Sequence, residues 1–94
     1  MPDIVRKVFG YHIYFWSNEN EPLEPVHIHI SKTPHKNATK YWILRNNTLL
    51  MDNNNDNIPP NDLKRIIRFL SLKSNIEGAK AKWLEHFGEI SFHE

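Results

Sequence analysis

The chain has 94 residues, with 12 basic and 11 acidic side chains and a formal net charge of +1. This length supports one hydrophobic core, so we expect a single domain over residues 1–94. The absence of cysteine excludes disulfides, thiolate metal ligands and a thiol nucleophile. The sequence contains no signal-peptide pattern and no apolar run that could span a membrane, and its charge is not that of a typical duplex-binding protein. We therefore expect a soluble cytoplasmic protein.

The first half of the chain, residues 1–52, is rich in aromatic and β-branched residues that favour strands. Gly10 predicts a bend or bulge within the first strand region, whereas residues 17–25 are polar, contain two prolines and predict a loop. Residues 33–37 and the pair Asn46-Asn47 predict turns. Residues 4–9 and 11–16, on either side of Gly10, are expected to form one strand region. Residues 26–31 and 39–45 are expected to form the second and third, and residues 48–51 a fourth. Because these regions follow one another closely, they predict a small antiparallel meander of three to four strands.

An asparagine- and aspartate-rich run over residues 52–57 joins the two halves and predicts a turn. A calcium-binding loop is disfavoured there, because the run lacks glycine at its sixth position. Leu63 also stands where such a loop needs a glutamate.

The second half, residues 58–88, predicts two helices. Pro59-Pro60 opens the first, whose apolar residues recur at the spacing of one helix face. Those residues are Leu63, Ile66, Ile67 and Leu70. Ser74 and Glu77 have the spacing of a capping box for the second helix, and Gly88 is placed to end it. The tail over residues 90–94 alternates like a short strand. The pattern predicts an α+β fold, with two helices packed on one face of the sheet.

His27 and His29 are the most informative residues, because residues i and i+2 of a strand point to the same face. We expect both imidazoles to project together, with Ile28 facing the opposite way. Two neighbouring imidazoles can bind a transition metal, move a proton near neutral pH or bind an anion. The alternative is that both are surface histidines on an open sheet face. Strand register, and with it the face that carries Trp42, is left open by the sequence.

The order of motifs resembles a family of small prokaryotic proteins called domain of unknown function 4160. The resemblance rests on residues 10–19, ending in Ser17-Asn18-Glu19, on residues 24–30 with the His27-x-His29 pair, and on residues 38–44. Residues 62–67 and 83–88 are similar to the helical half of that family. The resemblance implies the fold but no established activity. It also implies an association with small regulatory proteins, including toxin–antitoxin-like pairs.

The residues expected to form a functional face surround the two histidines. They are Ser17, Asn18, Glu19, Glu24, His27, His29 and Lys40. A metal site would use His27 and His29 with Glu19, or with Glu24, as the carboxylate ligand, and this set suits zinc, iron or nickel. No residue is identifiable as a nucleophile, so the catalytic residues of an enzyme stay unassigned.

A third interpretation is a binding face. Aromatic and basic side chains on a sheet can stack on bases and contact phosphates, and the same face can bind a protein. The eligible side chains are Tyr14, Trp16, Lys40, Tyr41, Trp42 and the two histidines. The sequence favours a non-enzymatic binding module with a protein partner, or a homodimer. The alternatives are a metal-assisted enzyme and an RNA-binding or other nucleic-acid-binding module.

Overall fold

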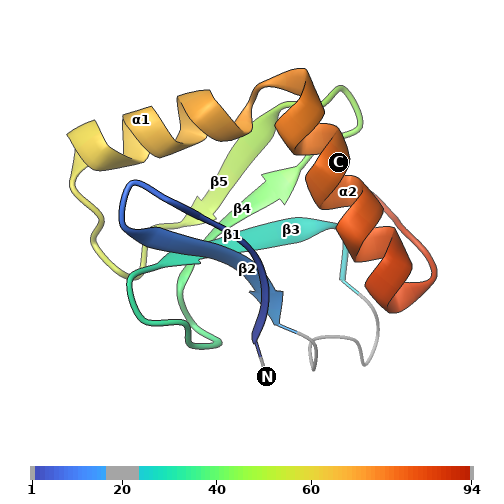
Figure 1. Ribbon diagram of the computed structural model, residues 1–94, viewed down its shortest axis with the longest axis horizontal. Coiled ribbons are helices and arrows are strands. Elements are labelled where there is room, and N and C mark those ends of the chain that lie inside the picture. The colour runs from blue at the N-terminus through green and yellow to red at the C-terminus, as the bar shows by residue number, and fades with distance from the viewer. Residues whose placement is uncertain (1, 17–23, 94) are drawn as a thin grey trace.

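The computed structural model describes residues 2–16 and 24–93, with side chains from residue 6 onward. Within these residues, five antiparallel strands form one sheet in the order of the chain, and two helices follow (Figure 1). The elements are β1 (Pro2–Val8), β2 (Tyr11–Trp16), β3 (His27–Ser31), β4 (Thr39–Ile43), β5 (Leu49–Asn53), α1 (Pro60–Leu70) and α2 (Lys73–Phe87). The α+β class and the meander are therefore confirmed.

The prediction of three to four strands is wrong, because the first strand region forms two strands. Val8 pairs with Tyr11, so Phe9 and Gly10 are the two central residues of a tight hairpin turn. Both have positive φ, 50° for Phe9 and 86° for Gly10. A two-residue turn of this kind needs positive φ at both positions and normally uses asparagine or glycine at the first. Because position 9 is phenylalanine, the sequence did not predict this hairpin turn.

The helices cover one face of the sheet, which carries the apolar core (Figure 1). Alternation along β2, β3 and β4 places Ile13, Ile28 and Ile43 on that face, where they meet Leu70 and Ile76 of the two helices. The largest fully buried core side chain is Trp83 of α2, which is 1% exposed. α1 is amphipathic and buries Leu63, Ile66 and Leu70, and packing of such a face stabilises a helix more than its intrinsic propensity does.

The ends of the helices match the predictions in part. α1 begins at Pro60, as the proline pair predicts. Gly88 ends α2 with φ of 79°, and its N–H donates to the Leu84 carbonyl at 2.8 Å. The capping-box prediction is wrong, because Leu72 occupies the N-cap position and makes no side-chain cap bond. Only Ser71 and Leu72 separate the helices, so the short connection places the start of α2 before Ser74.

The C-terminal tail does not form the expected strand over its described part. It runs along the end of the sheet, where the Ser91 carbonyl accepts a hydrogen bond of 2.9 Å from the Val26 N–H. His93 lies against the Trp42 ring, with 4.5 Å between ring centres and 7° between planes. The tail therefore reaches the sheet face opposite the helices.

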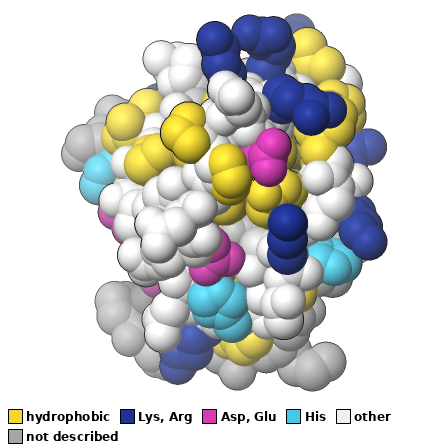
Figure 2. Space-filling view, turned by 90° about the vertical axis from the view of Figure 1, so that its left-hand side faces the viewer, with side chains coloured by type: hydrophobic (Ala, Val, Ile, Leu, Met, Phe, Trp, Pro, Cys, Tyr) yellow, Lys and Arg dark blue, Asp and Glu magenta, His cyan; other side chains and the backbone are white. Residues whose placement is uncertain are grey.

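Charged side chains are unevenly distributed over the face that Figure 2 shows. Figure 2 shows lysine and arginine side chains gathered beside exposed hydrophobic side chains at one end of the molecule. Neither helix in the described part of the chain is long and apolar enough to cross a membrane.

Candidate functional site

Strand pairing places the two histidines among polar and aromatic neighbours on the face opposite the helices. His29 pairs with Tyr14 of β2 and with Lys40 of β4, and His27 pairs with Trp42 of β4. Directly paired residues point to the same side of a sheet. This register answers the question that the sequence left open: Trp42 shares the histidine face, together with Lys40.

The histidine rings are buried, so their interpretation as exposed surface groups is wrong. His27 is 0% and His29 is 2% exposed. Their ring centres lie 5.1 Å apart, with the rings nearly perpendicular. His29 stacks on Tyr14 at 5.5 Å. His27, the first residue of β3, contacts Trp42 at 5.7 Å and Trp83 of α2 at 5.1 Å, so α2 reaches the histidine pair at this end of the sheet. Alternation in a strand predicts the shared direction of the two rings but not the side chains that surround them.

Backbone hydrogen bonds orient both imidazoles. Nδ1 of His27 lies 2.9 Å from the Pro25 carbonyl oxygen, and Nδ1 of His29 lies 3.3 Å from that of Ala38. A carbonyl can only accept, so Nδ1 carries a proton in each ring. Metal-binding histidines commonly have this arrangement, in which the nitrogen not bound to the metal donates to a carbonyl.

The carboxylate that the structure describes near this face is already paired. Glu24 Oε1 accepts a hydrogen bond of 2.5 Å from Lys40 Nζ, which also lies 4.3 Å from the centre of the Trp42 ring. Ser17, Asn18 and Glu19 lie outside the described residues. Within residues 2–16 and 24–93, no group of three or more His, Asp or Glu side chains is arranged to hold a metal ion.

The aromatic side chains of the central strands do not form an exposed stacking surface. Tyr14 is 0% exposed and Trp42 is 8% exposed. Tyr41 points to the opposite, helix-covered face, as alternation requires, and burial raises the pKa of its hydroxyl. Tyr14, Tyr41 and Trp42 are therefore largely covered within the folded chain, whereas Trp16 is half-buried.

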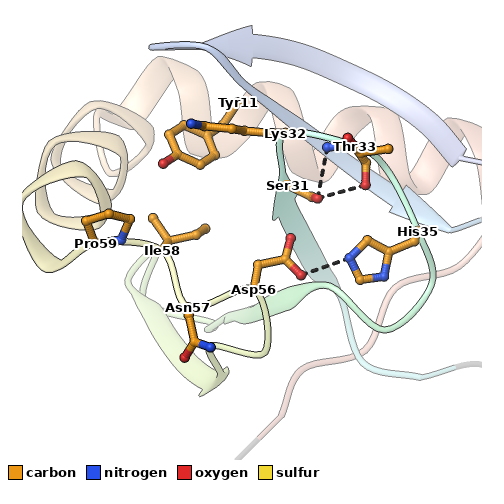
Figure 3. A pocket seen from close by; sticks show the side chains of 9 residues that line it. All are labelled: Tyr11, Ser31, Lys32, Thr33, His35, Asp56, Asn57, Ile58 and Pro59. Atoms are coloured by element: carbon orange, nitrogen blue, oxygen red, sulfur yellow. Dashed lines mark hydrogen bonds and ion pairs between the residues drawn. The ribbon is translucent and has the colours of Figure 1, made fainter.

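A second polar site was missed by sequence reasoning. His35 Nε2 lies 2.8 Å from Asp56 Oδ1, across a surface pocket of about 450 Å³ that is bounded by the β3–β4 turn and the segment before α1 (Figure 3). The two residues are 21 positions apart in the sequence, so no local motif predicts that they form a pair. Ser31 Oγ at this pocket donates to the Thr33 carbonyl at 2.8 Å. Its hydroxyl proton is thereby used within its own turn.

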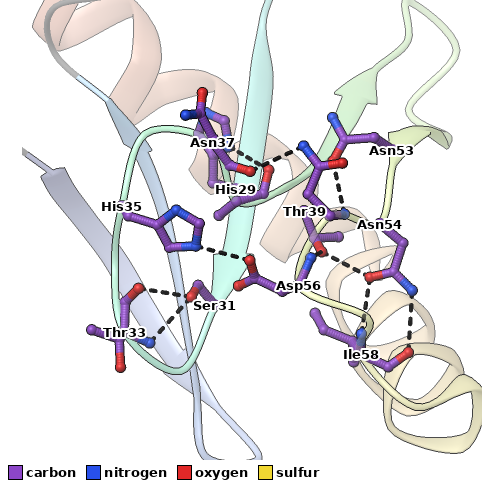
Figure 4. A network of polar contacts seen from close by, with 12 residues as sticks. His29, Ser31, Thr33, His35, Asn37, Thr39, Asn53, Asn54, Asp56 and Ile58 are labelled. Carbon is purple, nitrogen blue, oxygen red and sulfur yellow. Dashed lines mark hydrogen bonds and ion pairs between the residues drawn. The ribbon is translucent and has the colours of Figure 1, made fainter.

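The asparagine-rich segment after β5 fastens this region by side-chain hydrogen bonds. Asn54 Oδ1 accepts from the Thr39 hydroxyl at 2.8 Å and from the Ile58 N–H at 3.0 Å (Figure 4). Asn55 Nδ2 donates to the Asn37 carbonyl at 3.1 Å. The side-chain oxygen of Asn54 thus accepts hydrogen bonds that a backbone carbonyl would otherwise accept in a turn. This agrees with the prediction that residues 52–57 form a turn.

Tyr11 connects β2 to the first turn of α1. Its hydroxyl donates to Asp62 Oδ2 at 2.9 Å. Burial raises the pKa of the Tyr11 hydroxyl, and the hydrogen bond to Asp62 and the negative charge of that carboxylate raise it further. Lys32 Nζ lies 5.4 Å from the centre of the Tyr11 ring.

The fold and this geometry define a small α+β protein with a five-stranded meander, helices on one face and a buried histidine pair on the other. The model of the family described as domain of unknown function (DUF4160) matches residues 10–83. The chain therefore belongs to that family, and the resemblance stated from its motifs is confirmed. Searches among curated proteins and among solved structures find no significant match.

Proposed function

We propose that this protein is a small binding module that acts with a protein partner, as one component of a regulatory or toxin–antitoxin-like pair. The observation that supports the proposal best is the edge of the sheet at β5. This strand is the last in the sheet order and exposes two adjacent large apolar side chains, Leu50 and Met51.

The apolar side chains of β5 lie on both sides of the sheet edge. Leu50 pairs with Trp42 and Met51 with Tyr41, so the two side chains point to opposite faces, and each is 46% exposed. A strand edge also presents backbone N–H and C=O groups to an added strand. Proteins commonly bind an extended segment of a partner in this way, using backbone bonds for affinity and side-chain pockets for specificity.

A hollow of about 420 Å³ beside the edge supplies such a pocket. It is lined by Leu44, Arg45, Asn46, Leu50 and His93. Its apolar side chains are complementary to a partner strand that carries apolar residues.

The burial of the histidine pair supports a binding role over catalysis. A general acid or base must come within hydrogen-bond reach of its substrate. His27 at 0% and His29 at 2% exposure do not offer that access. The more exposed His35 has a carboxylate partner, but the nearby Ser31 hydroxyl is bonded within its turn.

Two substitutions of equally exposed leucines test the proposal. Leu50 lies on β5 and Leu84 on α2, and each is 46% exposed. We expect Leu50→Lys to abolish co-purification of the partner with the tagged protein from its own cells, whereas Leu84→Lys retains it. The proposal would be contradicted if both variants retained the partner, or if both lost it equally. A single species with twice the monomer mass would identify a second copy as the partner.

A metal-assisted enzyme is the second candidate. It is favoured by the hydrogen bonds from Nδ1 of both imidazoles to backbone carbonyls, which are common among metal-binding histidines. Two histidines bound to one tetrahedral zinc at about 2.1 Å would place their ring centres about 5 Å apart. The observed separation is 5.1 Å. Perpendicular aromatic rings in ordinary packing have similar separations, so this distance fits both interpretations.

Elemental analysis distinguishes the two interpretations. If the metal-assisted enzyme is correct, the protein takes up zinc, iron(II) or nickel stoichiometrically, and His27→Ala/His29→Ala abolishes the uptake. His93→Ala, which changes an exposed histidine, is the matched control. Because the double variant removes two buried rings, His29→Gln, with its fold checked by circular dichroism, provides a milder test. Unchanged uptake in folded variants would refute the metal site.

A further inference from the structure

We propose that a patch of stacked arginine and phenylalanine side chains at the β1–β2 turn and α1 binds single-stranded nucleic acid. The arginine–phenylalanine patch consists of Arg6, Phe9, Arg65 and Phe69, and Arg68 follows Arg65 by about one turn of α1. The patch shares no residue with the histidine pair or with the apolar side chains of the β5 edge, so this proposal is independent of the proposed function.

Phe9 is the most unusual residue of the patch. Its side chain is 51% exposed and its φ is 50°, a conformation that costs a bulky residue about 1–3 kcal/mol. Asparagine or glycine would satisfy the turn without that cost. An aromatic ring that is both strained and exposed contributes little to the core, which points to a role at the surface.

Two neighbouring phenylalanine rings lie between the two arginines of the patch. The Arg65 guanidinium lies 4.3 Å from the centre of the Phe9 ring, and that of Arg6 lies 5.2 Å from the centre of the Phe69 ring. The two phenylalanine rings meet edge to face at 6.2 Å. Planar guanidinium groups and aromatic rings are the surfaces on which unpaired bases stack.

The charge of the patch is available for phosphate. Arg65 and Arg68 are exposed on α1, and in the described part of the chain neither has an ion pair with an acidic side chain. The nearest acidic residue in α1, Asp62, instead accepts the Tyr11 hydroxyl. Arg6 uses one guanidinium nitrogen to donate to Asn75 and keeps its charge. Figure 2 shows basic side chains gathered beside exposed hydrophobic ones at the top of the molecule, where Figure 1 places α1.

A single strand fits this chemistry better than duplex nucleic acid or an acidic peptide. The overall charge of +1 provides no broad basic surface for a duplex. An acidic peptide would use the arginines but would give no role to the strained Phe9 ring. Unpaired bases use both, since the ring and guanidinium planes stack while the cationic groups contact phosphates.

The experiment titrates full-length protein into a fluorescently labelled oligouridylate of about 12 nucleotides and follows anisotropy at several salt concentrations. Contacts from Arg6, Arg65 and Arg68 to three phosphates predict a slope of log K against log salt of about −2. We expect Phe9→Asn to weaken binding about tenfold, because it removes one stacking ring. Asparagine tolerates positive φ, so the thermal midpoint should be unchanged or higher.

Two variants that each remove one positive charge distinguish binding at the patch from nonspecific binding to basic side chains elsewhere. Arg65→Gln should weaken binding and reduce the salt slope by about 0.7, whereas Lys36→Gln, in the β3–β4 turn, should leave both nearly unchanged. Equal losses in these two variants, or full binding by Phe9→Asn, would overturn the proposal. Tight binding of polyglutamate with no binding of the oligonucleotide would also overturn it and would assign the patch to an acidic protein.

Discussion

Replacing His29 by alanine tests whether the histidine pair is part of the packed interior. The side chain is 2% exposed, stacks on Tyr14 at 5.5 Å and donates to the carbonyl of Ala38, itself 1% exposed. Leaving that buried carbonyl without its donor costs about 1–3 kcal/mol. Loss of the ring contact adds about 0.5–1.5 kcal/mol. We therefore expect His29→Ala to lower the free energy of unfolding by about 2–4 kcal/mol, a large share of the total for a domain of this size.

The assay is urea denaturation followed by tryptophan fluorescence and circular dichroism, with His93→Ala as the control. His93 is exposed and stacks on Trp42 at the surface, so its replacement should cost less than about 1 kcal/mol. If His29→Ala also costs less than 1 kcal/mol, the reasoning from burial is refuted. That result would instead support the interpretation of the two histidines as surface residues on an open sheet face.

The remaining predictions concern the core and one buried hydroxyl. Trp83→Ala should cost about 3–5 kcal/mol in denaturant melts, because the ring is 1% exposed, whereas Leu84→Ala, 46% exposed, should stay within about 0.5 kcal/mol. Tyr14→Phe should cost about 1 kcal/mol, because its hydroxyl donates to and accepts from the backbone of the β3–β4 turn. In a tyrosinate absorbance titration, Tyr11 should ionise above the ordinary pKa of 10.0, and Asp62→Asn should lower its pKa without restoring that value, since burial is the larger cause. The pKa of Tyr11 is raised in the folded state, so the stability that its neutral hydroxyl contributes is complete below pH 10.0 and is lost as pH rises through the folded pKa. Ionisation of Tyr11 at or below pH 10.0 would contradict the burial argument.

Local patterns in the sequence predict most of the fold, because they report the period of each element. The alternation around His27 and His29 and the helical spacing of Leu63, Ile66 and Leu70 both correspond to observed elements. The five-stranded sheet was missed because Phe9 occupies a turn position that normally announces itself with asparagine or glycine.

The site was less predictable, because it depends on contacts between distant segments. The direction of the two histidine rings follows from their spacing, but their burial depends on Tyr14, Trp42 and Trp83, which come from three other elements. Lys40 and Glu24 were both candidate site residues, yet their ion pair requires a register that no local pattern specifies.

Photocrosslinking in cells tests the role of the β5 edge most directly. A photoreactive phenylalanine analogue would be placed at Leu50 in one variant and at the equally exposed Leu84 of α2 in another. We predict a discrete crosslink to one protein partner from position 50 and none from position 84. Crosslinks from position 84 alone, or from neither position when the partner is present, would contradict the account of this protein as a module that binds through its sheet edge.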